Sequence, residues 1–136
     1  MASRLNPYVM FDGNARQAME FYRDVLGGDL AVNTYAEMGE TDPARAEKVM
    51  HAMLETPSGF TLMASDLPPG AEHRPGNNVT ISLSGDDDAE LRGYWEKLCE
   101  GGTVSVPLEK QMWGDVFGAC TDRFGIEWMV DIGTEE

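Results

Sequence analysis

The chain has 136 residues, 42% of them apolar, and its ten basic and twenty-four acidic side chains give a formal net charge of −14 at pH 7. A field of that sign repels nucleic-acid phosphates and anionic membranes, and no basic patch with interleaved aromatic residues offsets it. We therefore expect neither nucleic acid nor a membrane as a partner, and we interpret the acidity as the solubilising surface of a globular protein.

Targeting and disulfide signals are absent from the sequence. The opening residues, MASRLNPYVMF, lack the long apolar core of a secretory signal, and no run of 18 consecutive apolar residues occurs that could span a membrane. The two cysteines, Cys99 and Cys120, are distant in sequence and have no CxxC spacing. We interpret them as small buried thiols rather than as a disulfide or a nucleophile, and we expect a cytoplasmic protein.

The first half begins with an alternating stretch from Leu5 to Asp12, which predicts a strand. Asn14 then is a candidate N-cap of a helix, with Gln17 placed to complete a capping box. The apolar positions of this helix follow a spacing of i, i+4, i+7 and i+11, which predicts one buried stripe. That stripe comprises Ala15, Met19, Tyr22 and Leu26, widened by Ala18 and Val25.

Gly27-Gly28 supplies a left-handed stop to this helix. Three strands are then expected near residues 29–36, 47–56 and 59–65, the last two joined by a tight turn at Pro57-Ser58-Gly59. The polar segment 37–46 does not fit this pattern, and we interpret it as an excursion or a short helical turn.

The second half repeats the same order after a Pro/Gly-rich linker at residues 67–78. This linker is a spacer or, given its length, a flap over a cavity, and its His73 is expected to be solvated. A strand from Val79 to Ser84 leads to a helix that starts in an Asp-rich turn, where the helix dipole favours negative charge. The helix carries an apolar stripe and ends at a second Gly pair, and three strands follow. The stripe is Leu91, Trp95 and Leu98, the Gly pair is Gly101-Gly102, and the strands lie near 103–108, 115–121 and 126–132.

The two halves match at an offset of about 73 residues, as expected for an internal repeat. "FY" at 21–22 corresponds to "YW" at 94–95, and "LGG" at 26–28 to "EGG" at 100–102. Coincidence between two ordinary amphipathic helices is the alternative, but the shared order of strand, helix, Gly pair and three strands favours duplication. The sequence thus predicts an α+β fold of two tandem βαβββ modules, residues 1–66 and 79–136, in one structural domain.

Four segments resemble the PhnB-like branch of the vicinal oxygen chelate superfamily, which contains glyoxalases, bleomycin resistance proteins and dioxygenases. They are NPYVMFDGNARQAMEFYRDVLGG, HAMLETPSGFTLMASD, GNNVTISLSGDD and MWGDVFGACTDRFGIEWMVDI. The resemblance implies that the paired modules form a curved mixed sheet around a cavity. Some such proteins are also labelled 3-demethylubiquinone-9 3-methyltransferases. This chain has no Gly-rich loop after the first strand of a parallel sheet, so we do not expect that activity.

The resemblance also implies where a metal would bind, because metal-dependent members place a His or carboxylate on the first and last strand of each module. Those positions fall here on Pro7, Met63, Asn78 (or its neighbour Val79) and Met129. Proline has no donor side chain, and thioethers suit soft Cu(I) rather than the hard or borderline cations of this chemistry. We therefore expect no metal at the usual place, and no cofactor.

An apolar pocket is the remaining candidate site. Aromatic residues on strands usually pack in the core, but a curved sheet would place several aromatic and Met side chains on a common cavity wall. The candidate pocket residues are Tyr8, Met10, His51, Met63, Trp113, Asp115, Trp128 and Met129. His51 is either a satisfied structural residue or an acid–base group that contacts ligand. Glu127 is expected on the face opposite Met129, and the DRFG segment (122–125) is expected to be a turn.

Two functions from different classes follow. The first is a metal-free protein that binds or sequesters a small apolar or aromatic molecule. The alternative is a lyase, isomerase or dioxygenase of the vicinal-oxygen-chelate type, which uses a non-standard metal site or an acid–base residue such as His51. We favour the binding protein because the site has few titratable groups, and the resemblance implies a homodimer.

Overall fold

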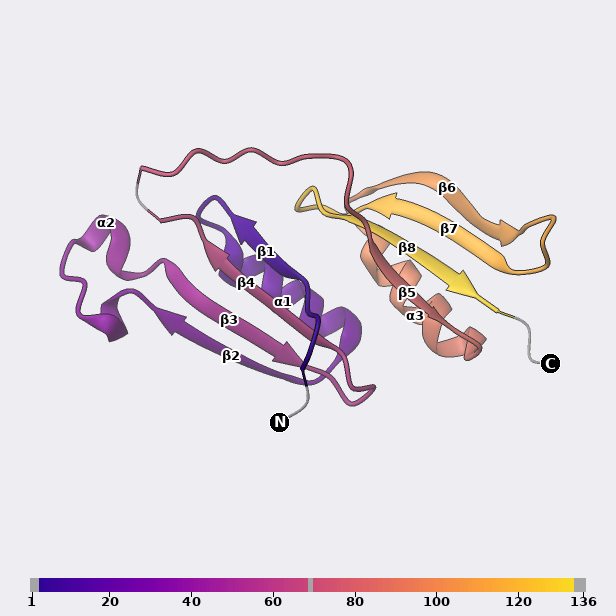
Figure 1. The fold of residues 1–136 in the computed structure, drawn as a ribbon, viewed down its shortest axis with the longest axis horizontal. Coiled ribbons are helices and arrows are strands. Elements are labelled where there is room, and N and C mark those ends of the chain that lie inside the picture. Colours follow the sequence, from indigo (N-terminus) through magenta and orange to yellow (C-terminus); the bar gives the residue numbers. More distant parts are fainter. Residues whose placement is uncertain (1–2, 69, 134–136) are drawn as a thin grey trace. The chain divides into compact units, whose positions relative to one another are not determined.

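The computed structural model describes residues 3–68 and 70–133, and the chain divides into two compact units, residues 1–75 and 76–136. Among these described residues, each unit contains four strands and one long helix, which are labelled in Figure 1. The elements of the first unit are β1 (Tyr8–Phe11), α1 (Ala15–Leu26), β2 (Asp29–Thr34), the 3₁₀ turn η1 (Ala36–Met38), α2 (Pro43–Ala46), β3 (Val49–Glu55) and β4 (Thr61–Asp66). The segment 37–46 therefore does form short helical turns.

The first unit is a four-stranded mixed sheet covered on one face by α1. Its strand order is β1-β4-β3-β2, with β1 parallel to β4 and the other neighbours antiparallel. Figure 1 shows α1 behind this sheet. The helix buries its predicted apolar stripe, all six residues of which are at most 7% exposed. No helix among the described residues of this unit lies against the opposite face of the sheet, and we call that face the first open face.

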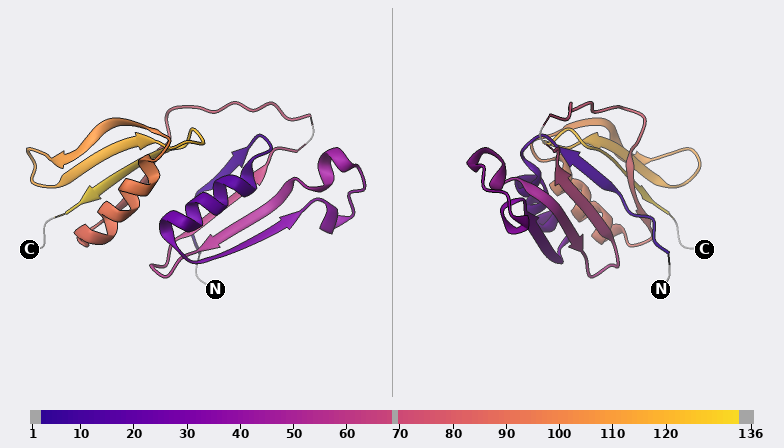
Figure 2. Two further views of the ribbon diagram at one scale, coloured as in Figure 1. Left: turned by 180° about the vertical axis from the view of Figure 1, so that it is seen from behind. Right: turned by 60° about the vertical axis from the view of Figure 1, so that its left-hand side comes forward.

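The second unit repeats this plan with the order β5-β8-β7-β6, in which β5 is parallel to β8. The left view of Figure 2 shows its long helix, α3, against the strands. Leu91, Trp95 and Leu98 of α3 are buried as expected, and Tyr94 joins them. The elements are β5 (Ile81–Gly85), α3 (Asp88–Cys99), β6 (Thr103–Lys110), β7 (Val116–Thr121) and β8 (Glu127–Ile132). The face of this sheet away from α3 is the second open face.

The helix starts are capped differently from each other. Asp87 caps α3 as its Asp-rich start indicates, because its carboxylate accepts a hydrogen bond from Glu90 N at 3.1 Å. The expected cap of α1 is wrong: Asn14 makes no side-chain capping hydrogen bond. Instead Asp66, the last residue of β4, accepts from Ala15 N at 2.9 Å and from Val49 N at 2.8 Å. One buried carboxylate thus joins the starts of α1 and β3 to the end of β4.

The Gly pairs shape equivalent corners in the two modules. Gly27 and Gly101 both have a φ of 76°, a positive value that glycine adopts readily and other residues rarely do. The second Gly of each pair lies against strand backbone: a Cβ on Gly28 would be 2.1 Å from Glu55 O, and one on Gly102 would be 2.2 Å from Thr121 O. The repeat predicted from sequence is confirmed, and the fold is α+β with two βαβββ modules and two four-stranded mixed sheets.

None of the described helices is long and apolar enough to cross a bilayer.

Candidate functional site

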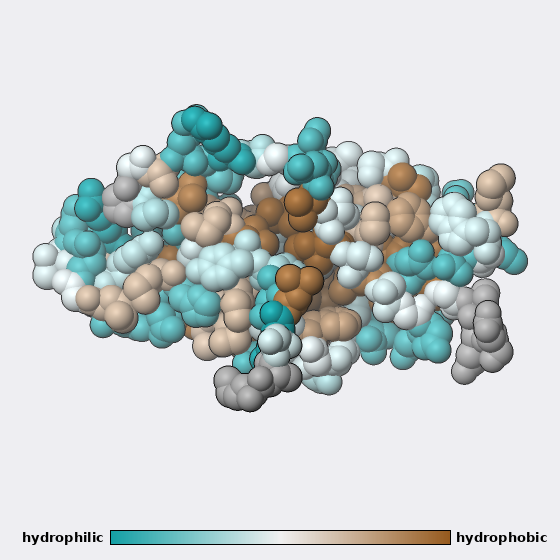
Figure 3. Space-filling model, in the orientation of Figure 1, coloured by the Kyte–Doolittle hydropathy of each residue, from teal (hydrophilic) through white to brown (hydrophobic). Residues whose placement is uncertain are grey.

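The first open face brings together four of the predicted pocket residues. Strand alternation puts Tyr8 and Met10 of β1 on this face, where their partners in β4 are Met63 and Ser65. Met63 in turn pairs with Met53 of β3. His51, two residues before Met53, shares the same face. Figure 3 views this side of the first unit, where brown and pale residues lie over the strands.

Two side-chain contacts lie on the first open face, and one of them joins strands that are not adjacent. Tyr8 Oη lies 3.5 Å from His51 Nδ1, and the two rings are 5.8 Å apart at 33°. Because β4 lies between β1 and β3, this pair crosses the strand that carries Met63. Ser65 Oγ donates to Met10 Sδ at 3.3 Å. Tyr8 is 47% exposed and Met10 37% exposed, so the face is open to a ligand.

The second open face carries Met129 with an aromatic pair and two carboxyl groups. Met129 lies between Ser82 of β5 and Ala119 of β7. Trp113, in the turn after β6, is 60% exposed and its ring lies 6.1 Å from that of Phe117 at 59°. Phe117 pairs with Asp131 across β7 and β8. Trp113 and Met129, both predicted pocket residues, are therefore on or beside this face.

Asp115 and Asp131 form a hydrogen-bonded carboxyl pair on the second open face. Desolvation raises the pKa of Asp131, and the hydrogen bond to Asp115 and its negative charge raise it further. Asp115 was a predicted pocket residue, whereas Asp131 was missed. The alternation that places Met129 on this face also places Asp131 there, so the signal was present in the sequence.

Trp128 does not lie on the second open face. It is 1% exposed and packs on the α3 side of the sheet, and its Nε1 donates to Asp122 Oδ2 at 2.9 Å. Asp122 also accepts from Phe124 N and Ile126 N, so DRFG is the turn that the sequence predicts. The expectation for Glu127 is wrong as well, because Glu127 and Met129 are two residues apart in β8 and share a face.

The positions that the resemblance implies for a metal do not suit a hard or borderline divalent cation. Pro7 offers only its carbonyl, which accepts from Met63 N at 3.0 Å. Met63 and Met129 offer thioethers, which such cations bind poorly. Asn78 is exposed in the segment before β5. Across residues 3–68 and 70–133, no three His, Cys, Asp or Glu side chains gather so that they could hold an ion.

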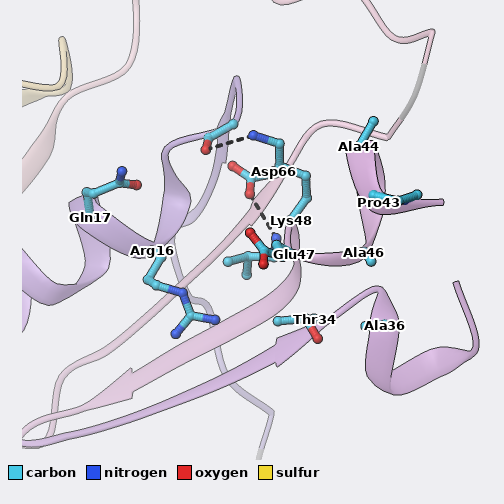
Figure 4. A pocket seen from close by; sticks show the side chains of 12 residues that line it. Arg16, Gln17, Thr34, Ala36, Pro43, Ala44, Ala46, Glu47, Lys48 and Asp66 are labelled. Atoms are coloured by element: carbon cyan, nitrogen blue, oxygen red, sulfur yellow. Dashed lines mark hydrogen bonds between the residues drawn. The ribbon is translucent and has the colours of Figure 1, made fainter. Parts of the chain in front are cut away.

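A pocket of about 670 Å³ lies elsewhere in the first unit, at the start of α1 (Figure 4). Its charged groups are Arg16 and Lys48 against Glu47 and Asp66, so they do not select an ion of either sign. Asp66 is occupied by its two backbone donors, and Lys48 Nζ lies 3.4 Å from Gly13 O. We therefore regard this pocket as a by-product of the α1 cap. Its wall also includes Gln17, Thr34, Ala36, Pro43, Ala44, Ala46 and Val49.

Comparisons with known proteins agree with this architecture. The family model of the glyoxalase/bleomycin resistance protein/dioxygenase superfamily matches residues 4–130. The chain belongs to this superfamily. The resemblance identified from the sequence motifs is confirmed.

Three relatives show how far the similarity extends. Protein YjdN of Escherichia coli is 25% identical over 140 residues, which cover 94% of each chain. The crystal structure of PA1353 from Pseudomonas aeruginosa matches 98% of this chain and 100% of its own, with 38% identity and a TM-score of 0.88. The PhnB protein from Bacillus cereus matches 96% of this chain and 100% of its own, at 20% identity and a TM-score of 0.76. At that identity, the likeness to PhnB shows the fold.

Proposed function

We propose that this superfamily member binds or sequesters a small planar molecule of apolar or aromatic character on its first open face. The contact between Tyr8 and His51 beside the methionines carries this proposal. Thioether side chains adapt to the shape of a ligand and make favourable contacts with aromatic rings. A single polar pair within such a surface fixes the orientation of the ligand, since its phenol and imidazole can bond to one polar substituent.

The metal positions support binding over metal-assisted catalysis. Vicinal-oxygen chelation needs oxygen or nitrogen ligands around one cation, and the corresponding residues here are a proline, two methionines and an exposed asparagine.

The alternative is an enzyme on the same scaffold, and the Asp115–Asp131 pair is the observation that favours it. A carboxyl group whose pKa is raised retains its proton to higher pH and can act as a general acid. His51 is a second candidate acid–base group, but its nearest polar contact is Tyr8 rather than a carboxylate. Stoichiometric zinc, iron, manganese or nickel in protein purified without chelator would favour this enzyme over the binding protein.

The binding proposal can be tested with Nile red, a neutral planar dye that the acidic surface does not repel. The Met63→Gln variant keeps the side-chain length but places an amide in the middle of the face. We expect it to weaken dye binding about tenfold, equivalent to about 1.4 kcal/mol. Tyr8→Phe should weaken binding of a dye or ligand that has a polar substituent, and should affect a wholly apolar one much less.

Met38→Gln is the matched control, because Met38 lies in the same unit and is 67% exposed in η1. It should bind the dye as the wild type does. Fluorescence titration gives the dissociation constants, and circular dichroism checks that the variants are folded. Equal weakening by Met38→Gln and Met63→Gln, or no saturable binding to the wild type, would contradict the proposal.

A further inference from the structure

The two cysteines of the chain are neighbours in the fold. Cys99 is the last residue of α3, and Cys120 lies on the α3 side of β7, where it is 2% exposed. Their thiols are joined by a side-chain hydrogen bond. The sequence gives no sign of this contact, because the two cysteines are 21 residues apart and have no CxxC spacing. The second βαβββ module brings them together.

Backbone contacts bring the end of α3 close to β7 independently of the two thiols. Gly102 N donates to Cys99 O at 3.0 Å, which folds the corner after α3 back on the helix end. The same Gly102 lies against the backbone of Thr121, where no Cβ would fit. Two residues further on, Val104 pairs with Cys120 across β6 and β7. The corner after α3 is therefore fixed to the helix end that carries Cys99 and to the strand that carries Cys120.

We propose that Cys99 and Cys120 are an oxidation site that closes into an intramolecular disulfide when the protein meets hydrogen peroxide. Cys99 is half-buried and the more accessible thiol, so it is oxidised first. Its sulfur attacks one peroxide oxygen, which breaks the O–O bond and gives a sulfenic acid and water. The sulfur of Cys120 then attacks the Cys99 sulfur and releases a second water. In total, two thiols and one peroxide give one disulfide and two waters.

The surroundings of the pair make this reaction slow at neutral pH. Burial raises the pKa of Cys99, and the hydrogen bond from Cys120 lowers it only in part. The pKa of Cys120 is raised to about 12 by burial and then by Cys99 and the carboxylate of Asp122. Its cross-strand neighbours, Val104 and Trp128, have no titratable group. Because the thiolate is the reactive form, the rate should rise with pH, and the site should respond to sustained rather than brief exposure.

The disulfide would join the end of α3 to β7. Because it would lower the conformational entropy of the unfolded chain, the free energy of unfolding of the second unit should rise. Exposure to hydrogen peroxide followed by denaturation and alkylation measures closure directly. We expect wild-type protein to lose both free thiols and about 2 Da of mass while its chain remains uncrosslinked. Its melting temperature should rise by about 5 °C or more.

Tryptic digestion identifies the bond, because Lys97, Lys110 and Arg123 put the two cysteines on different peptides. Residues 98–110 and 111–123 should run as one linked species until a reductant is added. Cys99→Ser is the matched control and should show neither the linked peptide nor the rise in melting temperature. Cys120→Ala should likewise show neither change, and peroxide should leave its Cys99 as a sulfenic acid that a dimedone probe traps.

Three results would overturn the proposal. The first is persistence of both free thiols after peroxide treatment at raised pH. The second is oxidation of Cys99 to a sulfinic acid while Cys120 stays a thiol. The third is a disulfide that forms only between chains.

Discussion

Asp66 and Asp122 show how single side chains organise each module. Both are buried, at 2% and 3% exposure, and both carboxylates accept several hydrogen bonds that the backbone or an indole would otherwise leave unmade. The sequence predicted a local cap for α1 at Asn14, because capping rules use neighbours along the chain. Asp66 could not be predicted in this role, since only the pairing of β1 with β4 brings it to the start of α1.

Tyr8, Met10, His51 and Met63 lie on one open face of the first unit. The two faces of β8 are harder to assign from the sequence. In EWMVDI both alternating sets contain large apolar residues, so alternation alone does not tell which set faces the helix. For that reason Trp128 was placed in the pocket, and Asp131 was overlooked.

The Asp115–Asp131 pair gives a prediction of pH dependence. Because the pKa of Asp131 is raised in the folded protein, its contribution to stability is fully present below the ordinary value of 3.8 and is lost as pH rises through the folded pKa. Near pH 7 the two carboxylates repel each other. Asp131→Asn should therefore raise the free energy of unfolding at about pH 7, and the gain should shrink toward about pH 3.5.

Urea unfolding at the two pH values measures this difference. Asp29→Asn, an exposed acid at the start of β2 in the other unit, is the control and should show no such trend. A variant at Asp131 that is less stable than wild type near pH 7, or equally stabilised at both pH values, would contradict the assignment.

At the scale of elements, the duplicated corner after each helix explains why two glycines occur together. The first adopts a positive φ, and the second allows the chain to pass against a strand backbone. Helix periodicity and the Gly pair were enough to predict α1 and α3. Strand ends were less predictable: residues 5–12 were expected as a strand, but β1 spans Tyr8–Phe11, where it pairs with β4.

Replacing glycine by alanine should have opposite effects at two positions of the second unit, Gly102 in the corner after α3 and Gly93 within the helix. Gly102→Ala should cost about 2–4 kcal/mol of unfolding free energy, because its Cβ would overlap backbone atoms that cannot move independently. Gly93→Ala should instead stabilise the protein by about 0.5–1 kcal/mol, as a helix-interior Gly replaced by Ala. Gly93 lies within α3, and a Cβ added there would meet nothing within 4 Å beyond the helix's own backbone.

Chemical denaturation followed by circular dichroism measures both variants. A Gly102→Ala protein within about 0.5 kcal/mol of wild type would show that the corner relaxes more easily than its close packing indicates.

At the scale of the whole molecule, internal repetition was the strongest signal in the sequence. Two copies of the same order of elements predict the fold class, which the structure confirms. The resemblance of four sequence segments to known proteins predicts the superfamily, which the family match confirms. The natural ligand could not be predicted. Ligand specificity depends on a few side-chain positions, and one fold supports many functions.

We also predict that the protein is a homodimer in solution. Val104, Val106 and Trp113 of the second unit are 45%, 36% and 60% exposed, and apolar side chains of this kind are commonly covered by association. Light scattering coupled to size-exclusion chromatography should give twice the chain mass of 15.0 kDa. A single species at the chain mass, unchanged at higher protein concentration, would contradict this.

The three tryptophans of the second unit differ in solvent exposure, so their fluorescence can report on this unit separately. Trp128 is buried and its indole donates a hydrogen bond to a carboxylate, and Trp95 is buried on the sheet side of α3. Trp113 is 60% exposed. A water-soluble cationic quencher such as caesium, which the acidic surface does not repel, should therefore reduce the red-shifted emission from Trp113. It should leave the blue-shifted emission from the two buried indoles almost unchanged. Partial unfolding of the core would then change the blue-shifted emission, and ligand binding near Trp113 would change the red-shifted emission. Both events can be followed in one fluorescence spectrum.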